Sequence, residues 1–201
     1  ITDLPILRFG EVLLNYAEAK AELGTITQAD LDVSIKLLRD RVGMPNLSMA
    51  DANSNPDTFM EDQYPTVSGA NKGLVLEIRR ERRIELYMEN FRWDDIVRWK
   101  SGQTITQSLR GLYFPGVGEY DLDADGNTDV VLYEGETPDI SGEGVQYIKL
   151  GSDLYLDENN LVNPQPDFNN RSFNENRDYL YPIPRVELQL NPNLTQNPGW
   201  E

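Results

Sequence analysis

The sequence predicts a mainly α protein, built of TPR-like helical hairpins with long irregular loops and a few short β-hairpins. Apolar residues recur at steps of three and four in residues 4–43 and again in residues 71–102, which is the period of an amphipathic helix. That period disappears in the loop-rich region 103–201, where Gly, Asn, Pro and Asp dominate. A chain of 201 residues is long enough for one sizeable core, and we expect residues 1–201 to form a single domain.

The first hairpin is expected to consist of two helices joined by a short turn. In the first helix, residues 4–23, the apolar stripe is formed by Phe9, Val12, Leu13, Tyr16, Ala19 and Leu23. Gly24 suits the end of that helix, and Thr27 with Asp30 resembles a capping box at the start of the next one. The second helix carries a stripe formed by Leu31, Ile35, Leu38 and Val42, and Gly43 ends it.

The second hairpin follows an aperiodic segment. Residues 44–71 are rich in Asn, Pro, Asp and Ser, so we expect a long surface loop there. Helical spacing returns from Leu74 to Glu89, and a further helix from about Arg92 to Lys100 should end before Gly102. Two hairpins of similar size suggest stacked TPR-like units.

The loop-rich region contains little that could be regular. Val130–Tyr133 and Val145–Leu150 alternate in polarity and are expected to be strands of small hairpins. From Tyr181 onward prolines recur, and each proline fixes its own φ and holds the preceding residue in an extended conformation. We therefore expect a stiff tail without regular structure.

Composition excludes several classes of function. The chain has no cysteine and no histidine, so it offers no thiolate nucleophile, no Ser-His-Asp triad, no imidazole base and no zinc site of Cys and His ligands. Its net charge of −16 disfavours binding to nucleic acid and to anionic lipid. The chain begins at Ile1 without a membrane span or a signal peptide, so we treat it as a piece whose targeting segment, if any, lies upstream.

A ladder of charged residues runs along the second hairpin. Its members are spaced by four, four, three, three and three residues: Glu81, Glu85, Glu89, Arg92, Asp95 and Arg98. Like charges four residues apart destabilise a helix, so the three glutamates need partners, and Arg8, Arg39 and Arg41 of the first hairpin can supply them. We expect structural ion pairs from Arg39 or Arg41 to the glutamates, and the alternative is a solvated polar face. Neither arrangement is catalytic.

A second motif points to a metal ion. Asp121, Asp123, Asp125 and Asp129, with the carbonyl of Asn127, can surround a hard cation, and Gly126 allows the sharp turn. The twelfth position of an EF-hand would be Leu132 instead of glutamate, so a shorter Asp-rich loop between strands fits better. We expect one structural calcium ion. An empty Asp-Gly turn is the alternative.

Several aromatic residues lie outside the helical stripes. Tyr64 in the long loop, and Tyr113 and Phe114 before Pro115, could offer flat faces to sugar rings. The tyrosines of the loop-rich region could do the same, namely Tyr120, Tyr133, Tyr147 and Tyr155. The alternative is that these rings are buried around small satellite cores.

Four segments in order resemble a known family. The first segment is ILRF at 6–9 with YAEA at 16–19, and the second is LRDRVG at 38–43. The third is ERRIEL at 81–86, followed by Glu89, Arg92, Asp95 and the pair Arg98-Trp99. The fourth is YPIP at 181–184, followed by NP at 191–192 and QNPGW at 196–200. They are similar to the "R-y-a-E", "iR-x-RaG", "ERR-x-EL-x-x-E-x-x-R-x-x-D-x-x-RW" and "YPIP…NP…QNPGY" motifs of SusD/RagB-like outer-membrane nutrient-binding lipoproteins. Trp200 stands where tyrosine is more usual. The chain resembles the carboxyl-terminal portion of such a protein.

The resemblance implies a function that composition alone does not show. Family members are surface-exposed lipoproteins of the outer membrane of Bacteroidetes. They bind a polysaccharide or oligosaccharide and deliver it to a SusC-like TonB-dependent transporter. The resemblance also implies a fold of TPR-like hairpins and a lipid anchor on the missing amino-terminal part, which would be the only membrane association.

We therefore expect a non-catalytic glycan-binding protein, with sugar contacts at Tyr64, Tyr113 and Phe114 and purely structural tryptophans in the motifs. The first alternative is a helical-repeat scaffold that binds a partner protein without recognising glycans. A calcium-dependent glycosidase is the second alternative, and it is disfavoured because no isolated pair of carboxylates stands apart from the ladder.

Overall fold

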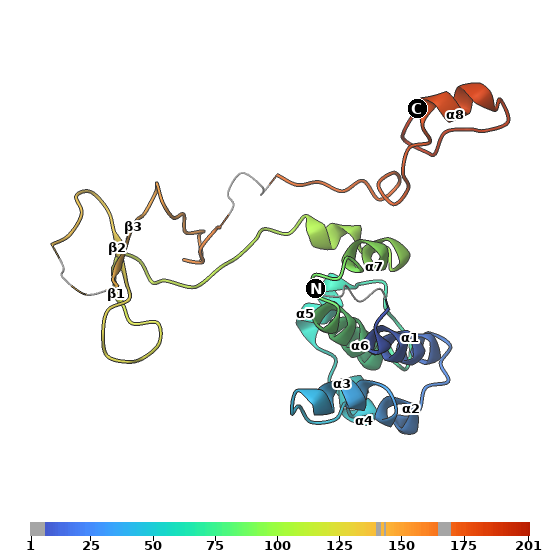
Figure 1. Ribbon diagram of the computed structural model, residues 1–201, viewed down its shortest axis with the longest axis horizontal. Coiled ribbons are helices and arrows are strands. Elements are labelled where there is room, and N and C mark those ends of the chain that lie inside the picture. The colour runs from blue at the N-terminus through green and yellow to red at the C-terminus, as the bar shows by residue number, and fades with distance from the viewer. Residues whose placement is uncertain (1–6, 140–141, 143, 165–169) are drawn as a thin grey trace, which may run out of the picture. The chain divides into compact units, whose positions relative to one another are not determined.

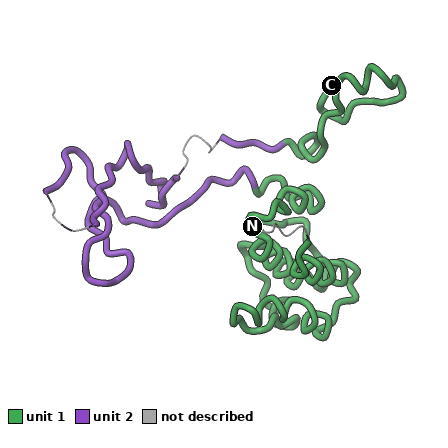
Figure 2. The backbone as a smooth tube through the Cα atoms, in the orientation of Figure 1, with its two compact units in different colours: residues 1–104, 174–201 green, residues 105–173 purple. Residues whose placement is uncertain are grey.

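The computed structural model describes residues 7–139, 142, 144–164 and 170–201. Residues 4–6 of the first expected helix lie outside the described residues. The chain forms two compact units, one of residues 1–104 with 174–201 and one of residues 105–173 (Figure 2). The second unit begins close to residue 103, where the sequence loses its helical period.

The first unit is helical, which confirms the mainly α fold (Figure 1). Its elements are α1 (Phe9–Glu22), α2 (Gln28–Asp32), α3 (Ile35–Arg41), α4 (Met49–Ser54), α5 (Thr58–Gln63), α6 (Lys72–Glu85), α7 (Arg92–Arg98), the 3-10 turn η1 (Gly102–Ile105) and α8 (Arg185–Leu190). Helix α6 is central, because it contacts α1, α3, α4 and α5. None of the described helices is long and apolar enough to cross a membrane.

The first hairpin has the expected ends but buries an unexpected face. Gly24 follows α1 with a φ of 68°, and Thr27 with Asp30 forms the expected capping box. However, α1 buries the face that bears Leu13, Leu14, Ala17 and Ala21. The other part of the expected stripe faces outward, since Phe9 is 69% exposed.

The second expected helix of this hairpin is divided into α2 and α3. The break falls at Ser34, which is fully buried and whose hydroxyl donates to the carbonyl of Asp30 at 2.5 Å. A hydroxyl that bonds to the carbonyl four residues earlier competes with the helical hydrogen bond and bends the helix.

The expectation of a long loop at residues 44–71 was wrong, because α4 and α5 lie within it. Both helices begin at a side-chain cap. Ser48 accepts a hydrogen bond from the amide of Asp51, and Asp57 accepts one from the amide of Met60. Such short helices are marginal in isolation, so packing against α6 must stabilise them.

The charge ladder does not follow one continuous helix. Helix α6 ends at Glu85 and α7 begins at Arg92. In the turn between them, Met88 and Asn90 adopt left-handed φ values of 66° and 67°. Left-handed residues end a right-handed helix, so the ladder is split between two helices.

The tail contains one short helix, α8, contrary to the expectation that it would have no regular structure. Pro184 precedes the helix, a place where its missing N–H costs nothing. The two tail motifs hold each other: Gln196 exchanges two hydrogen bonds with the backbone of Ile183, and the Trp200 indole N–H donates to the carbonyl of Leu180 at 2.9 Å.

The second unit contains a three-stranded sheet in the order β1 (Gly118–Tyr120), β2 (Val130–Tyr133) and β3 (Gln146–Lys149). Strands β1 and β2 form an antiparallel hairpin, with Tyr120 opposite Val130. The two strands expected from the sequence are both present, but β2 and β3 are parallel and do not form a hairpin with each other. A small separate core lies here, formed by Phe114, Val130, Leu132 and Val162.

We predict that Gly73→Ala destabilises the protein, because the backbone of α4 leaves no room for a side chain at Gly73 of α6. A Cβ at residue 73 would lie 1.9 Å from the carbonyl oxygen of Ala52, a backbone atom. The change should lower the free energy of unfolding by about 1 to 3 kcal/mol. Gly10→Ala is the matched control, since its Cβ would meet side-chain ends instead of backbone, those of Arg8 at 3.2 Å and of Glu85 at 3.4 Å. Urea denaturation measures both variants, and equal stabilities would contradict the prediction.

Candidate functional site

The acidic loop connects β1 to β2, so it lies between two antiparallel strands. Asp121 organises it: one carboxylate oxygen accepts from the amide of Ala124 at 2.7 Å and the other from the amide of Gly126 at 2.8 Å. Gly126 has a φ of 91°, a conformation that favours glycine. The backbone is thereby folded around the Asp121 side chain.

Three of the four expected carboxylates converge. Asp121, Asp123 and Asp129 each offer an oxygen, and these oxygens lie within 4.8 Å of one another. Two ligand oxygens of one calcium ion can be at most about 5 Å apart, because each lies about 2.3 to 2.6 Å from the ion. The three donors therefore fit a hard cation in spacing and in chemistry.

Asp125 differs from the other three. Its carboxylate accepts hydrogen bonds from the side chain and the backbone amide of Asn127, at 3.0 and 2.7 Å. The side-chain bond, followed by the backbone bond, lowers the pKa of Asp125 below its usual 3.8. Asp125 lies outside the group of three converging oxygens.

The glutamates of α6 meet arginines of α3. Arg39 Nε donates to Glu81 at 2.7 Å, and both side chains are nearly buried, with 12% and 14% of their surface exposed. Arg41 pairs with Glu85 at 2.8 Å, but its own side chain is 59% exposed. Exposed pairs contribute little, so Arg39–Glu81 is the stronger link between the hairpins.

Arg8, just before α1, supplies the remaining link. Its guanidinium contacts Glu85 at 2.6 Å and Glu89 at 2.9 Å. The hydrogen bond that Arg8 donates to Glu85 is the largest effect on Arg8, and with the Glu89 contacts it raises the pKa of Arg8 above its usual value despite partial burial. Each glutamate of the ladder therefore has an arginine partner.

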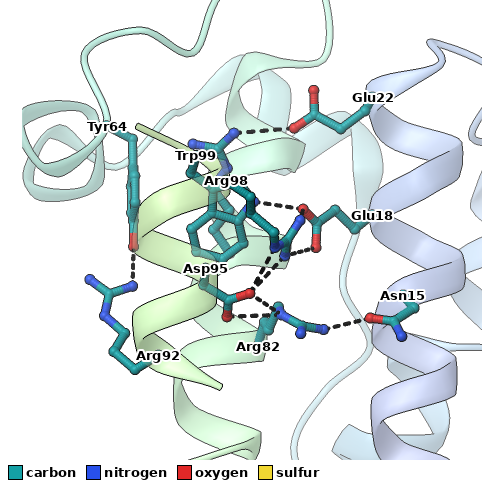
Figure 3. A network of polar contacts seen from close by, with 10 residues as sticks. Asn15, Glu18, Glu22, Tyr64, Arg82, Arg92, Asp95, Arg98 and Trp99 are labelled. Atoms are coloured by element: carbon teal, nitrogen blue, oxygen red, sulfur yellow. Dashed lines mark hydrogen bonds and ion pairs between the residues drawn. The ribbon is translucent and has the colours of Figure 1, made fainter. Parts of the chain in front are cut away.

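A more deeply buried network lies between α1, α6 and α7 (Figure 3). Arg82 Nε donates to both carboxylate oxygens of Asp95, at 2.8 and 2.9 Å, and Arg82 Nη1 donates to Asn15 at 2.7 Å. Only 5% of Arg82 and 2% of Asp95 is exposed. Arg82 was not among the site residues predicted from the sequence, although its position in the ERRIEL motif was a signal for it.

Glu18 is a second residue through which α1 joins this network. It accepts from Arg98 Nη2 and from the indole N–H of Trp99, both at 2.6 Å, and Arg98 also donates to Asp95 at 2.9 Å (Figure 3). Burial raises the pKa of Glu18, but the hydrogen bonds from Arg98 and Trp99 outweigh it, and the pKa lies below the usual 4.5. Glu18 therefore stabilises the fold above pH 4.5, and this contribution is lost as the pH falls through the lowered value.

Two of the three expected sugar-binding aromatics are buried, so that expectation was wrong for them. Tyr64 is 1% exposed; its ring packs edge-on against Trp99 and its hydroxyl accepts from Arg92 at 3.0 Å. Phe114 is 5% exposed and packs against Tyr120. Both rings serve cores, as Trp99 does at 6% exposure, whereas Tyr113 is 61% exposed.

Tyr113 belongs to a small β-like arrangement of three extended segments in the second unit. Tyr113 bridges to Leu161, and Leu156 bridges to Val162, both antiparallel. The amides of Gly111 and Asn163 donate to neighbouring segments at 2.7 Å. Residues 111–114, 160–163 and 155–157 therefore lie side by side in that order.

The two faces of this arrangement differ. Phe114 and Val162 are buried on one face, and successive side chains alternate between faces. Tyr113 and Tyr155 lie on the other face and are 61% and 45% exposed. We call this pair of tyrosines the aromatic face. Asp157, two residues after Tyr155, contacts the largely exposed Arg110 at 3.7 Å.

We predict that Asp95→Asn destabilises the protein by about 3 to 5 kcal/mol, because it leaves the buried Arg82 charge without its counter-ion. Asp40→Asn is the control, since Asp40 pairs with Lys36 on the surface and should contribute less than about 1 kcal/mol. Chemical denaturation of both variants gives the two values. Similar small losses in both would show that the Arg82–Asp95 pair is energetically unimportant.

Comparison with known proteins shows the family of this chain. The family model described as the SusD family matches residues 2–200. SusD-like protein P2 of Formosa agariphila is 26% identical over 195 residues, which are 96% of this chain and 25% of that protein. A SusD-like protein of Bacteroides fragilis, known from its crystal structure, has a similar fold, with a TM-score of 0.55, 24% identity and the same two coverages. The chain spans about a quarter of the length of these relatives. Because the family model matches almost every residue, the chain belongs to the SusD family.

Proposed function

We propose that this chain is part of a non-catalytic glycan-binding protein on the cell surface, which delivers its ligand to a TonB-dependent transporter of the outer membrane. The observation that carries the proposal is the SusD-family match over residues 2–200. The lack of histidine and cysteine is in keeping with binding instead of catalysis, as is the pairing of every ladder glutamate with arginine. Membrane attachment would come from a lipid anchor outside this chain.

Within this chain, we place the glycan contact on the aromatic face. A pyranose ring presents a face of C–H groups that packs well on a flat aromatic ring, while its hydroxyls need polar partners. Tyr113 and Tyr155 provide exposed rings on one face, and Arg110 and Asp157, nearby in the chain, provide a donor and an acceptor. Tyr64 and Phe114 are not included because they are buried.

We predict that Tyr113→Ala and Tyr155→Ala each weaken retention of the intact protein in gels that contain its glycan, by about tenfold in apparent affinity. We expect the loss of one stacked ring to cost about 1.4 kcal/mol of binding free energy, which corresponds to a factor of ten in affinity. Tyr87→Ala is the matched control, because Tyr87 is 76% exposed but belongs to the turn after α6. Circular dichroism checks that all three variants fold, and a reducing-sugar assay should detect no hydrolysis.

Other outcomes of the same experiment favour the alternatives. Retention unchanged in both aromatic-face variants would exclude this face as the glycan contact. If no glycan of a broad panel retards the intact protein, the scaffold function without glycan recognition is favoured. Release of reducing ends would instead support a glycosidase.

We further propose that the acidic loop holds one structural calcium ion through Asp121, Asp123 and Asp129. The support is the convergence of their oxygens within 4.8 Å. The Asn127 carbonyl remains a further expected ligand. Asp125, the fifth expected ligand, lies outside the three converging carboxylates.

We predict that millimolar calcium raises the melting temperature of the EDTA-treated protein, since an ion that binds only the folded state stabilises it by mass action. Asp123→Asn should abolish this shift. Glu119→Gln should retain it, because Glu119 is an acidic neighbour that bonds to Thr128 and lies outside the three converging carboxylates. Differential scanning calorimetry measures the shifts. An equal shift in both variants would refute the site.

A further inference from the structure

Arg79 of α6 is a buried cation with incomplete hydrogen bonding. Only 6% of the residue is exposed, and its Nη2 donates to Glu22 at 3.2 Å. Its Nε and Nη1 are buried and have no hydrogen-bond partner within the described part of the chain. These two nitrogens carry three of the five N–H groups of the guanidinium. Buried donors without partners are costly, so this arrangement requires an explanation.

The neighbouring rings stabilise the charge of Arg79 without satisfying its N–H groups. The guanidinium carbon lies 4.7 Å from the ring centre of Trp99 and 5.2 Å from that of Tyr64. Both are cation–π contacts, which are electrostatic and supply no acceptor oxygen. Glu22 is half exposed, so its charge is partly screened by water.

A cavity of about 400 Å³ lies beside Arg79. Its walls are Glu22 and Gly24 at the end of α1, residues 66–71, and Val75 and Arg79 of α6. This volume is within the usual range for a small-molecule site. Thr66, Ser68 and Asn71 are the lining residues with uncharged polar side chains.

Arg79 is the one cation among the described lining residues of the cavity, and Glu22 is the one anion. Arg82 and Arg98 are balanced by Asp95 and Glu18, whereas Arg92 has no carboxylate partner among the described residues and bonds only to the hydroxyls of Tyr64 and Thr104.

We propose that this cavity binds the carboxylate of an acidic sugar, a uronate, with Arg79 as its anchor. A carboxylate is the natural acceptor for a guanidinium, because it can take two parallel N–H bonds, and Glu22 uses only one of the available nitrogens. The hydroxyl-bearing lining would meet the sugar hydroxyls. The choice of a sugar as the carrier of the carboxylate rests on the proposed glycan-binding function.

The test is isothermal titration of the intact protein with sodium glucuronate, glucose and sodium acetate at constant ionic strength. Glucuronate should bind, and glucose should bind at least tenfold more weakly. Acetate should also bind more weakly than glucuronate, because it lacks the hydroxyls. Equal binding of acetate and glucuronate would overturn the sugar part of the proposal, and equal binding of glucose and glucuronate would overturn the role of the carboxylate.

Variants distinguish ligand binding in the cavity from a purely structural role of Arg79. Glu22→Gln removes the competing carboxylate and should tighten glucuronate binding several-fold without affecting glucose. Ala70→Phe places a large ring at an exposed position of the lining and should abolish binding without disturbing the core. Arg79→Lys should weaken binding at least tenfold, and Glu11→Gln, a charge change elsewhere on α1, should leave it unchanged.

The outcomes are distinguishable from those for the aromatic face. Glucuronate binding that is insensitive to both Glu22→Gln and Ala70→Phe, or no binding at all, overturns the cavity proposal even if Tyr113 and Tyr155 retain a glycan. Glucuronate binding with the expected variant pattern but no retention of any glycan polymer supports the cavity and counts against the proposed function.

Discussion

The buried ion pair between Arg82 and Asp95 is the interaction on which the helical unit depends. It joins α6 to α7, and through Arg98 and Glu18 it also holds α1. A charge that is 95% or more buried is tolerated only when a counter-ion and further hydrogen bonds accompany it. The relative positions of three helices are therefore constrained by one carboxylate, which must lie within reach of two guanidinium groups.

This constraint explains why α6 is so rich in charge although it is the central helix. Its two sides have different partners: Glu81 and Glu85 face the arginines of the first hairpin, while Arg82 faces α7 and Arg79 faces the cavity beside α1. The apolar residues between them, such as Leu74, Leu76 and Ile78, form the core. The ERRIEL motif thus describes a helix that is bonded to different partners on neighbouring faces.

Sequence reasoning predicted features that depend on local spacing, such as the capping box at Thr27, the end of α1 at Gly24 and strand β2. It did not predict features that neighbouring segments decide. Helix α1 has two apolar stripes, and only packing against α6 selects the one that contains Leu14. Tyr64 is in an aperiodic segment, which suggested exposure, yet tertiary contacts bury its ring. Glu18 looked like one more polar residue because the partner that neutralises it is 80 residues away.

The different burial of the ion pairs makes them respond differently to ionic strength. Dissolved ions screen charges in contact with water, so added salt should weaken Arg41–Glu85, where Arg41 is 59% exposed, and should hardly affect Arg82–Asp95. The same ions reduce the mutual repulsion that comes with a net charge of −16. The helical unit should therefore keep its internal geometry in brine, with salt acting mainly on the acidic exterior.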